Sequence, residues 1–117
     1  MKINYTEFAE YIEQRFLTLR DIKIIGEEED LEKVKIRISA TIYDTNVPVL
    51  LEFVIMHKTL ILESVEVLDP NLPPADKRAA LKTALYTIPP FVRLRLVGDN
   101  KIFLLDRYPI NSIIDKV

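Results

Sequence analysis

Five cations occupy alternating positions in two stretches of the chain, and these are the residues best placed to bind a charged ligand. Lys33, Lys35 and Arg37 form one set, and Arg93 and Arg95 form the other. Side chains two residues apart on a β-strand point to the same face. If both sets lie on the same side of one sheet, they form a basic ladder that can follow the phosphates of a nucleic acid or another polyanion. Alternatively, flanking acidic residues neutralise the ladder through cross-strand pairs, and few aromatic side chains are available to stack on bases.

A second candidate surface is apolar. In the stretch 47–57, all odd-numbered positions except the last are apolar, which is typical of a strand face that packs against a core. The even-numbered positions should then face water, yet Leu50, Val54 and Met56 are large and apolar. We expect these three side chains to be shielded from water. The shielding group is another part of the chain (for example 109–117), a subunit or partner protein, or a small ligand.

Catalytic and metal-binding residues are scarce. The acidic run 27–30 could attract a hard cation, but it lacks the glycine and the alternating spacing of an EF-hand loop, and we expect a solvated hairpin tip. His57 is the single histidine, whereas a transition-metal site needs three or four ligands. The chain has no cysteine and two glycines, which excludes thiol chemistry and glycine-rich phosphate loops. We therefore expect no enzymatic activity, no metal and no cofactor.

Length and composition describe one globular domain over residues 1–117. Of the 117 residues, 49% are hydrophobic and 29% are charged, which supports a single core. The net charge of −2 provides no overall basic field for nucleic acid. The start of the chain lacks the pattern of a secretory signal, and no stretch has the ~18 apolar residues of a membrane span. Together with the lack of cysteine, these features predict a cytoplasmic protein that does not insert into a membrane.

The elements that position these residues can be predicted from hydrophobic periodicity and from turn residues. Apolar residues at spacings of three and four predict a helix over 5–20, capped by Asn4. Alternation and Asp- or Asn-containing turns predict a meander of antiparallel strands. A loop with three prolines, 69–74, leads into a second helix, which two further prolines end. The predicted strands are 22–27, 33–43, 47–57, 60–68, 91–97 and 101–105, the second helix is 75–87, and a short third helix can start at Pro109.

This order predicts an α+β fold, a two-layer sandwich in which two or three helices pack on an antiparallel meander sheet. The order of elements is α-β-β-β-(β)-α-β-β-(α). Strands arrive in hairpin-linked groups, so a doubly wound parallel sheet is not expected. The even-numbered face of 33–43, which includes Val34, Ile36 and Ile38, should pack against the helices.

The order of elements resembles the secretion-chaperone-like fold, which is seen in type III secretion chaperones and YbjN-like proteins. That fold also has a first helix, a three-stranded meander, a second helix, two strands and a final helix. The resemblance concerns topology, and the strand 60–68 is additional to the pattern. It implies a dimeric domain that binds polypeptide and has no catalysis of its own. The matching stretches are Tyr5–Arg20, Ile22–His57, Ala75–Thr87, Phe91–Leu105 and Pro109–Val117.

Two functions follow as expectations. The first is a small cytoplasmic protein–protein interaction module, homodimeric and chaperone- or adaptor-like, that binds through Leu50, Val54 and Met56. Its partner is a second copy of itself or another protein. The alternative is binding of nucleic acid or another polyanion through the basic ladder, which consists of Lys33, Lys35, Arg37, Arg93 and Arg95.

Overall fold

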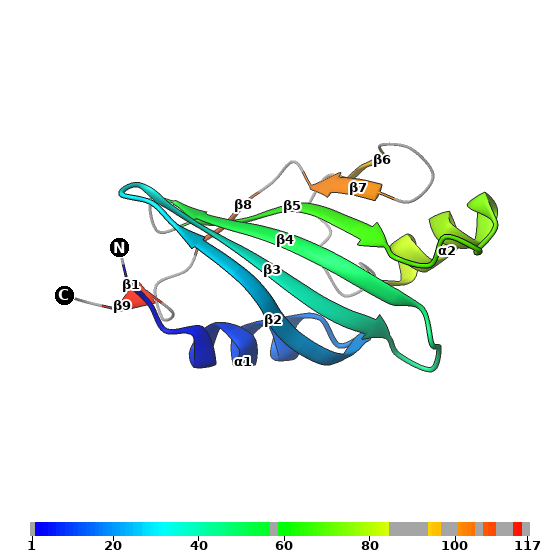
Figure 1. Cartoon of the computed structure of the whole chain (residues 1–117), viewed down its shortest axis with the longest axis horizontal. Helices are drawn as coiled ribbons and strands as arrows, with labels where there is room; N and C mark the ends of the chain where they lie inside the picture. Colours follow the sequence, from blue (N-terminus) through cyan, green and yellow to red (C-terminus); the bar gives the residue numbers. More distant parts are fainter. Residues whose placement is uncertain are drawn as a thin grey trace.

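The structure is a computed structural model that describes residues 2–56, 59–84, 94–96, 101–104, 107–109 and 114–115. Two helices and a meander of four antiparallel strands confirm the predicted α+β class (Figure 1). The elements in chain order are β1 (Lys2–Ile3), α1 (Tyr5–Arg15), β2 (Leu19–Glu29), β3 (Lys33–Ile42), β4 (Pro48–Met56), β5 (Thr59–Val67), α2 (Pro74–Ala84), β6 (Leu94–Leu96), β7 (Lys101–Leu104), β8 (Arg107–Pro109) and β9 (Ile114–Asp115).

The main sheet has the strand order β2-β3-β4-β5-β7-β6, and β8 also pairs with β5. All of its pairings are antiparallel. Strands β1 and β9 form a separate two-stranded sheet, in which the two ends of the chain lie side by side (Figure 1). Among the described strands, β2 is therefore one edge of the main sheet, and β6 is the other.

Helix α1 is shorter than its hydrophobic periodicity predicts. The Asn4 side chain caps its start by accepting a hydrogen bond from the Glu7 amide at 3.1 Å. The helix ends at Arg15, and the predicted end at Arg20 is wrong. Leu19 instead begins β2, where it pairs with Ile42 and is buried. Pairing with a strand thus overrides the local helical pattern in the last predicted turn.

Strand β2 also extends further than predicted at its other end. Glu28 and Glu29 lie in the strand together with Glu27, so their predicted position in a turn is wrong. The hairpin loop comes later, at residues 30–32, where the Asp30 amide donates to the Lys33 carbonyl at 2.9 Å. Glu28 lies opposite Lys35 in the register, and this pairing of opposite charges favours the strand over a solvated turn.

The core lies between the sheet and the helices. The even-numbered residues of β3 and the odd-numbered residues of β4 are buried, as the alternation predicts. Phe8 and Phe16 each contact Phe53 of β4 edge-to-face, with ring centroids 5.5 Å and 6.0 Å apart. Leu81 and Ala84 of α2 join the same core. Both helices therefore pack on one face of the sheet, with α1 running along it (Figure 1).

The C-terminal segment differs from the prediction of a short third helix. Pro109 lies in β8, and Ile114 and Asp115 lie in β9, so these residues are in strands. Pairing with β5 and β1 provides hydrogen-bond partners for the backbone of these residues, which a helical turn would otherwise provide. The remaining residues of that segment, residues 85–87 of the second predicted helix, and His57 lie outside the described residues.

No helix within the described part of the chain is both long enough and apolar enough to span a membrane.

Candidate functional site: the outer face of the sheet

The outer face of the sheet is the face of β2 to β5 that points away from both helices. On β3 it carries Lys35, Arg37, Ser39 and Thr41, which alternate with the buried core residues. The register places the even-numbered residues of β4 beside them, so that Ser39 lies opposite Leu50 and Thr41 opposite Pro48. Both predicted surfaces, the basic ladder and the apolar residues, thus have members on this one face.

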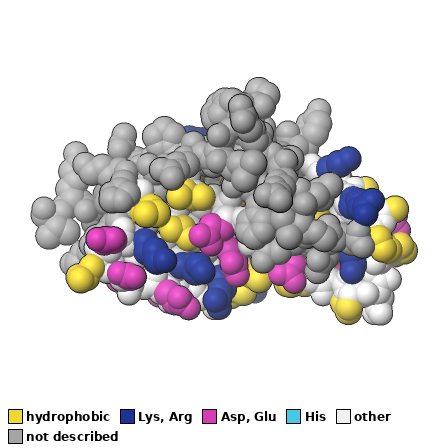
Figure 2. All heavy atoms as spheres, turned by 90° about the horizontal axis from the view of Figure 1, so that it is seen from above, with side chains coloured by type: hydrophobic (Ala, Val, Ile, Leu, Met, Phe, Trp, Pro, Cys, Tyr) yellow, Lys and Arg dark blue, Asp and Glu magenta, His cyan; other side chains and the backbone are white. Residues whose placement is uncertain are grey.

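The cations at the centre of the outer face are paired with carboxylates of neighbouring strands. Arg37 lies between two of them, with Nε 3.7 Å from Glu52 Oε1 and Nη2 3.8 Å from Glu28 Oε1. Lys35 Nζ lies 3.9 Å from Glu63 Oε2. Figure 2, which views the molecule from the side opposite α1, shows basic and acidic side chains next to one another. Three acids therefore surround two cations, and the potential of this face is mixed.

The sheet order separates the two halves of the predicted basic ladder. Arg95 lies in β6, and strands β4, β5 and β7 stand between β6 and β3. Four inter-strand spacings amount to ~19 Å, so Arg95 and Arg37 do not share one phosphate-binding track. Lys33 is exposed at the start of β3, while Arg93 lies outside the described residues. Among the described members of the basic ladder, Lys33, Lys35 and Arg37 lie on one strand together.

The three predicted apolar residues differ in exposure. Val54 is only 3% exposed, between Lys35 on β3 and Ile61 on β5, so for Val54 the chain itself provides the cover. Leu50 and Met56 are half-buried. Of the predicted interface, Leu50 and Met56 are thus the residues that a partner can reach in this conformation.

Leu50 belongs to an apolar patch that includes a residue missed in the sequence. Leu68 follows β5, is 43% exposed, and its amide donates to the Pro48 carbonyl at 3.0 Å. A register shift after Glu52 puts the even-numbered positions of the last part of β5 on the outer face, which simple alternation does not reveal. We call Pro48, Leu50 and Leu68 the outer patch.

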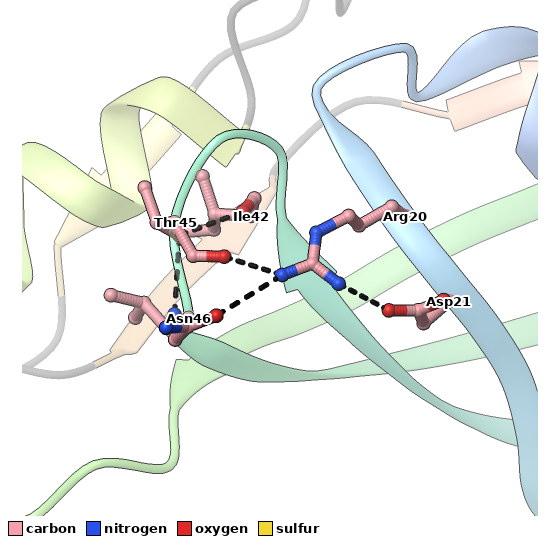
Figure 3. Close-up of polar contacts among 6 residues, drawn as sticks. Arg20, Asp21, Ile42, Thr45 and Asn46 are labelled. Carbon is pink, nitrogen blue, oxygen red and sulfur yellow. Dashed lines mark hydrogen bonds and ion pairs between the residues drawn. The ribbon is translucent and has the colours of Figure 1, made fainter.

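A polar cluster holds the β3–β4 turn beside the outer patch. Arg20 of β2 forms an ion pair with Asp21 and donates a hydrogen bond to the Thr45 carbonyl at 2.6 Å (Figure 3). The Asn46 side-chain oxygen accepts a longer hydrogen bond from the same guanidinium, at 3.4 Å. Within the turn, the Thr45 hydroxyl donates to the Ile42 carbonyl at 2.7 Å. The start of β4, which carries the outer patch, is therefore fixed to the edge strand.

A hollow of about 130 Å³ opens on the outer face beside the β2 edge. It is lined by residues of both charges and by one glycine, namely Gly26, Glu27, Glu28, Lys35 and Arg37. Its walls include no nucleophile with a neighbouring base. Among the described residues, no three acidic or histidine side chains are placed to hold a metal ion.

The acidic end of β2 also contacts α1. The Tyr5 hydroxyl donates a hydrogen bond to Glu29, and burial, this hydrogen bond, and the charges of Glu27 and Glu29 raise the pKa of Tyr5 well above its usual value. A phenol that stays protonated in this way is a structural hydrogen-bond donor. We assign it no part in chemistry.

Comparison with protein-family models, with curated proteins and with solved structures finds no match for this chain.

Proposed function

We propose that this chain is a non-enzymatic protein–protein interaction module of the cytoplasm, chaperone- or adaptor-like, that works as a homodimer. The observation that supports this is the outer patch, where Pro48 and Leu50 of β4 lie beside Leu68, which directly follows β5, and all three apolar side chains are partly exposed. Such a patch, bounded by polar and paired charged groups, has the make-up of a protein-binding surface. Leu50 is its centre, and Met56 extends the apolar surface towards the other end of β4.

The scaffold below the outer patch suits binding without much rearrangement. The neighbouring odd-numbered residues Val49 and Leu51 are fully buried, and the Arg20 contacts hold the adjacent turn. A surface that is already ordered loses little conformational entropy when a partner binds. An extended peptide segment with apolar residues is the ligand that this surface fits best.

Selection from a displayed library of random peptides tests this proposal. We expect enrichment of peptides with apolar residues, and we expect Leu50→Asp to weaken their binding at least tenfold because a charge replaces the central contact. Leu31→Asp is the matched control, since Leu31 is 95% exposed in the β2–β3 loop and far from the patch along the strands. Circular dichroism confirms that both variants are folded.

Two outcomes would contradict the proposal. One is a selection that enriches no peptide. The other is binding that Leu50→Asp and Leu31→Asp weaken equally.

Binding of nucleic acid or another polyanion is the second candidate, favoured by the position of Lys33, Lys35 and Arg37 on one strand. The carboxylates beside Lys35 and Arg37 oppose it. Fluorescence anisotropy with labelled single- and double-stranded oligonucleotides at low salt separates the two functions. The polyanion function requires binding that falls steeply with salt and that Arg37→Ala weakens, whereas the protein-binding proposal expects no binding.

A further inference from the structure

The edge strand β2 presents backbone groups that no other described strand pairs. Among the described strands, its single neighbour is β3. An exposed edge of eleven residues is a template for another strand, and proteins usually shield such edges with charges and bulges. Strand β2 has both devices, with register shifts after Arg20 and after Ile24. The central residue Ile25, however, is 58% exposed and apolar, which shielding does not explain.

The charges along β2 are divided between its two halves. The first half carries Arg20, Asp21 and Lys23, of which Arg20 and Asp21 pair with each other, and three glutamates occupy residues 27–29. Lys23 forms no ion pair within the described part of the chain. An antiparallel second copy of the same strand places Lys23 of each copy near the glutamates of the other, whereas a parallel copy places glutamate beside glutamate. The strand is therefore complementary to itself in one orientation.

Gly26 provides an independent reason for a close neighbour at this edge. Its backbone is not in the left-handed region, and an added Cβ would meet only the Arg37 side chain, at the ordinary distances of 3.8 and 3.9 Å. A single chain thus has no need of glycine here, although glycine destabilises a strand. Gly26 lines the hollow described above, whose volume of about 130 Å³ is roughly four times that of a water molecule in the liquid.

We infer that two copies of this chain form a dimer by antiparallel pairing of their β2 strands, with Ile25 of each copy in the hollow at Gly26 of the other. The two-fold axis passes between Ile25 and Gly26, and Lys23 lies opposite Glu28 of the second copy. Both members of that pair are on the outer face, because Lys23 pairs with Ser39 and Glu28 with Lys35 within one chain. The aliphatic parts of Lys35 and Arg37 contact the inserted Ile25.

This inference rests on the homodimer in the proposed function and adds the surface that joins the copies. A two-fold axis between antiparallel strands is perpendicular to the sheet. It keeps both outer faces on the same side of one continuous sheet. The two outer patches then remain free and can bind one partner chain at two places. The register shifts limit the number of backbone hydrogen bonds between the two β2 strands. The affinity of the two copies for each other therefore depends on the Lys23–Glu28 contacts and decreases with salt.

Sedimentation equilibrium of the full chain tests the assembly. At high concentration and low salt we expect about twice the chain mass of 13.6 kDa. We expect Gly26→Val to raise the dissociation constant at least tenfold, because valine fills the hollow while its Cβ meets only the flexible Arg37 side chain. Leu31→Val, in the exposed β2–β3 loop, is the control and leaves the mass unchanged.

Charge exchange provides a second variant set. Lys23→Glu or Glu28→Lys alone should weaken the dimer, and the double variant Lys23→Glu/Glu28→Lys should restore it, since the exchanged charges again lie opposite each other. Rescue of this kind is not expected if either residue acts only within its own chain.

Disulfide trapping tests the register directly, because the chain has no native cysteine. A mixture of Lys23→Cys and Glu28→Cys chains should form a covalent dimer under mild oxidation, since opposite Cα atoms lie about 5 Å apart. Each variant alone should not, because its two cysteines are then ~16 Å apart.

The β2 interface is overturned if the chain forms a dimer that Gly26→Val does not weaken and that the mixture of cysteine variants does not trap. In that case the proposal that the chain is a homodimer still stands. A chain that is monomeric at every concentration overturns the homodimer as well. Peptide binding through Leu50 is measured separately and is independent of both results.

Discussion

The Tyr5 hydroxyl donates a hydrogen bond to the Glu29 carboxylate and so joins the first turn of α1 to the last residue of the edge strand β2. The two residues are 24 positions apart in the chain. The contact holds the helix against the acidic half of β2, which our inferred dimer uses. Its strength depends on the charge of Glu29 and on the proton of Tyr5.

Tyr5→Phe removes this hydrogen bond and should lower the free energy of unfolding by about 1 kcal/mol at pH 7, a discounted value because the pair is partly exposed. The raised pKa of Tyr5 adds a pH dependence. Above pH ~10 the unfolded chain loses the phenol proton before the folded chain does, so stability falls as the pH rises. The difference between wild type and Tyr5→Phe should therefore shrink in that range.

Urea denaturation between pH 7 and pH 11 measures this difference. The exposed Tyr43 is the matched control, and Tyr43→Phe should leave the free energy of unfolding at pH 7 within about 0.5 kcal/mol of wild type. A constant difference between wild type and Tyr5→Phe across this range would refute the assigned coupling.

Arg20→Ala should lower the free energy of unfolding by about 1 kcal/mol, because the guanidinium contacts Asp21 of its own strand and the β3–β4 turn. Arg20→Lys should recover only part of the loss, since an ammonium group cannot reproduce the planar fork of donors. Lys82→Ala, an exposed change on α2, is the control, and all three are compared by urea denaturation. Full recovery with lysine would show that charge alone matters.

Phe53→Ala should destabilise the chain by roughly 3–5 kcal/mol, because the ring is fully buried between Phe8 and Phe16 and its loss leaves a cavity. Phe53→Leu preserves much of the volume and should cost clearly less. Leu31→Ala should stay within about 0.5 kcal/mol of wild type, as expected for an exposed site. Thermal unfolding ranks the three variants, and equal losses at Phe53 and Leu31 would contradict the described core.

Asp44 has a positive φ of 63° in the β3–β4 turn, a conformation that disfavours most side chains. Asp44→Gly should therefore raise the free energy of unfolding, by up to about 1 kcal/mol, while Asp44→Val should lower it by roughly 1–2 kcal/mol. Asp30→Gly is the control in the other hairpin loop, where φ is not positive, and it should give no gain. Urea denaturation measures these changes, and we expect the change in the free energy of unfolding to have opposite signs for Asp44→Gly and Asp44→Val. Changes of the same sign would contradict the prediction.

Much of the fold could be predicted because its signals are local. The alternation of Val34, Ile36 and Ile38 with charged residues identifies a strand and its buried face without knowledge of its neighbours. The cap at Asn4 and the turn at Asp44 are likewise properties of a few adjacent residues. The end of α1 at Arg15 could not be predicted in this way, because the pairing of Leu19 with Ile42 competes with the helical pattern from 23 residues away.

The candidate site was predicted only in part, for the same reason. Leu50 and Met56 could be identified from the excess of apolar residues on β4, but Leu68 joins the outer patch only through a register shift. The carboxylates beside Arg37 come from β2 and β4, and no spacing along the chain reveals which acids will face it.

The sequence alone determined which residues of each strand face the same way, because side-chain direction in a strand repeats every two residues. It therefore established the α+β class, the core face of β3 and β4, and the cations that share β3. The tertiary structure decided which strands are neighbours. It brought Glu28, Glu52 and Glu63 to the cations, placed Arg95 four strands away, and put Gly26 at an open edge. Strand order and register depend on contacts between distant segments, and a local periodicity carries no information about them.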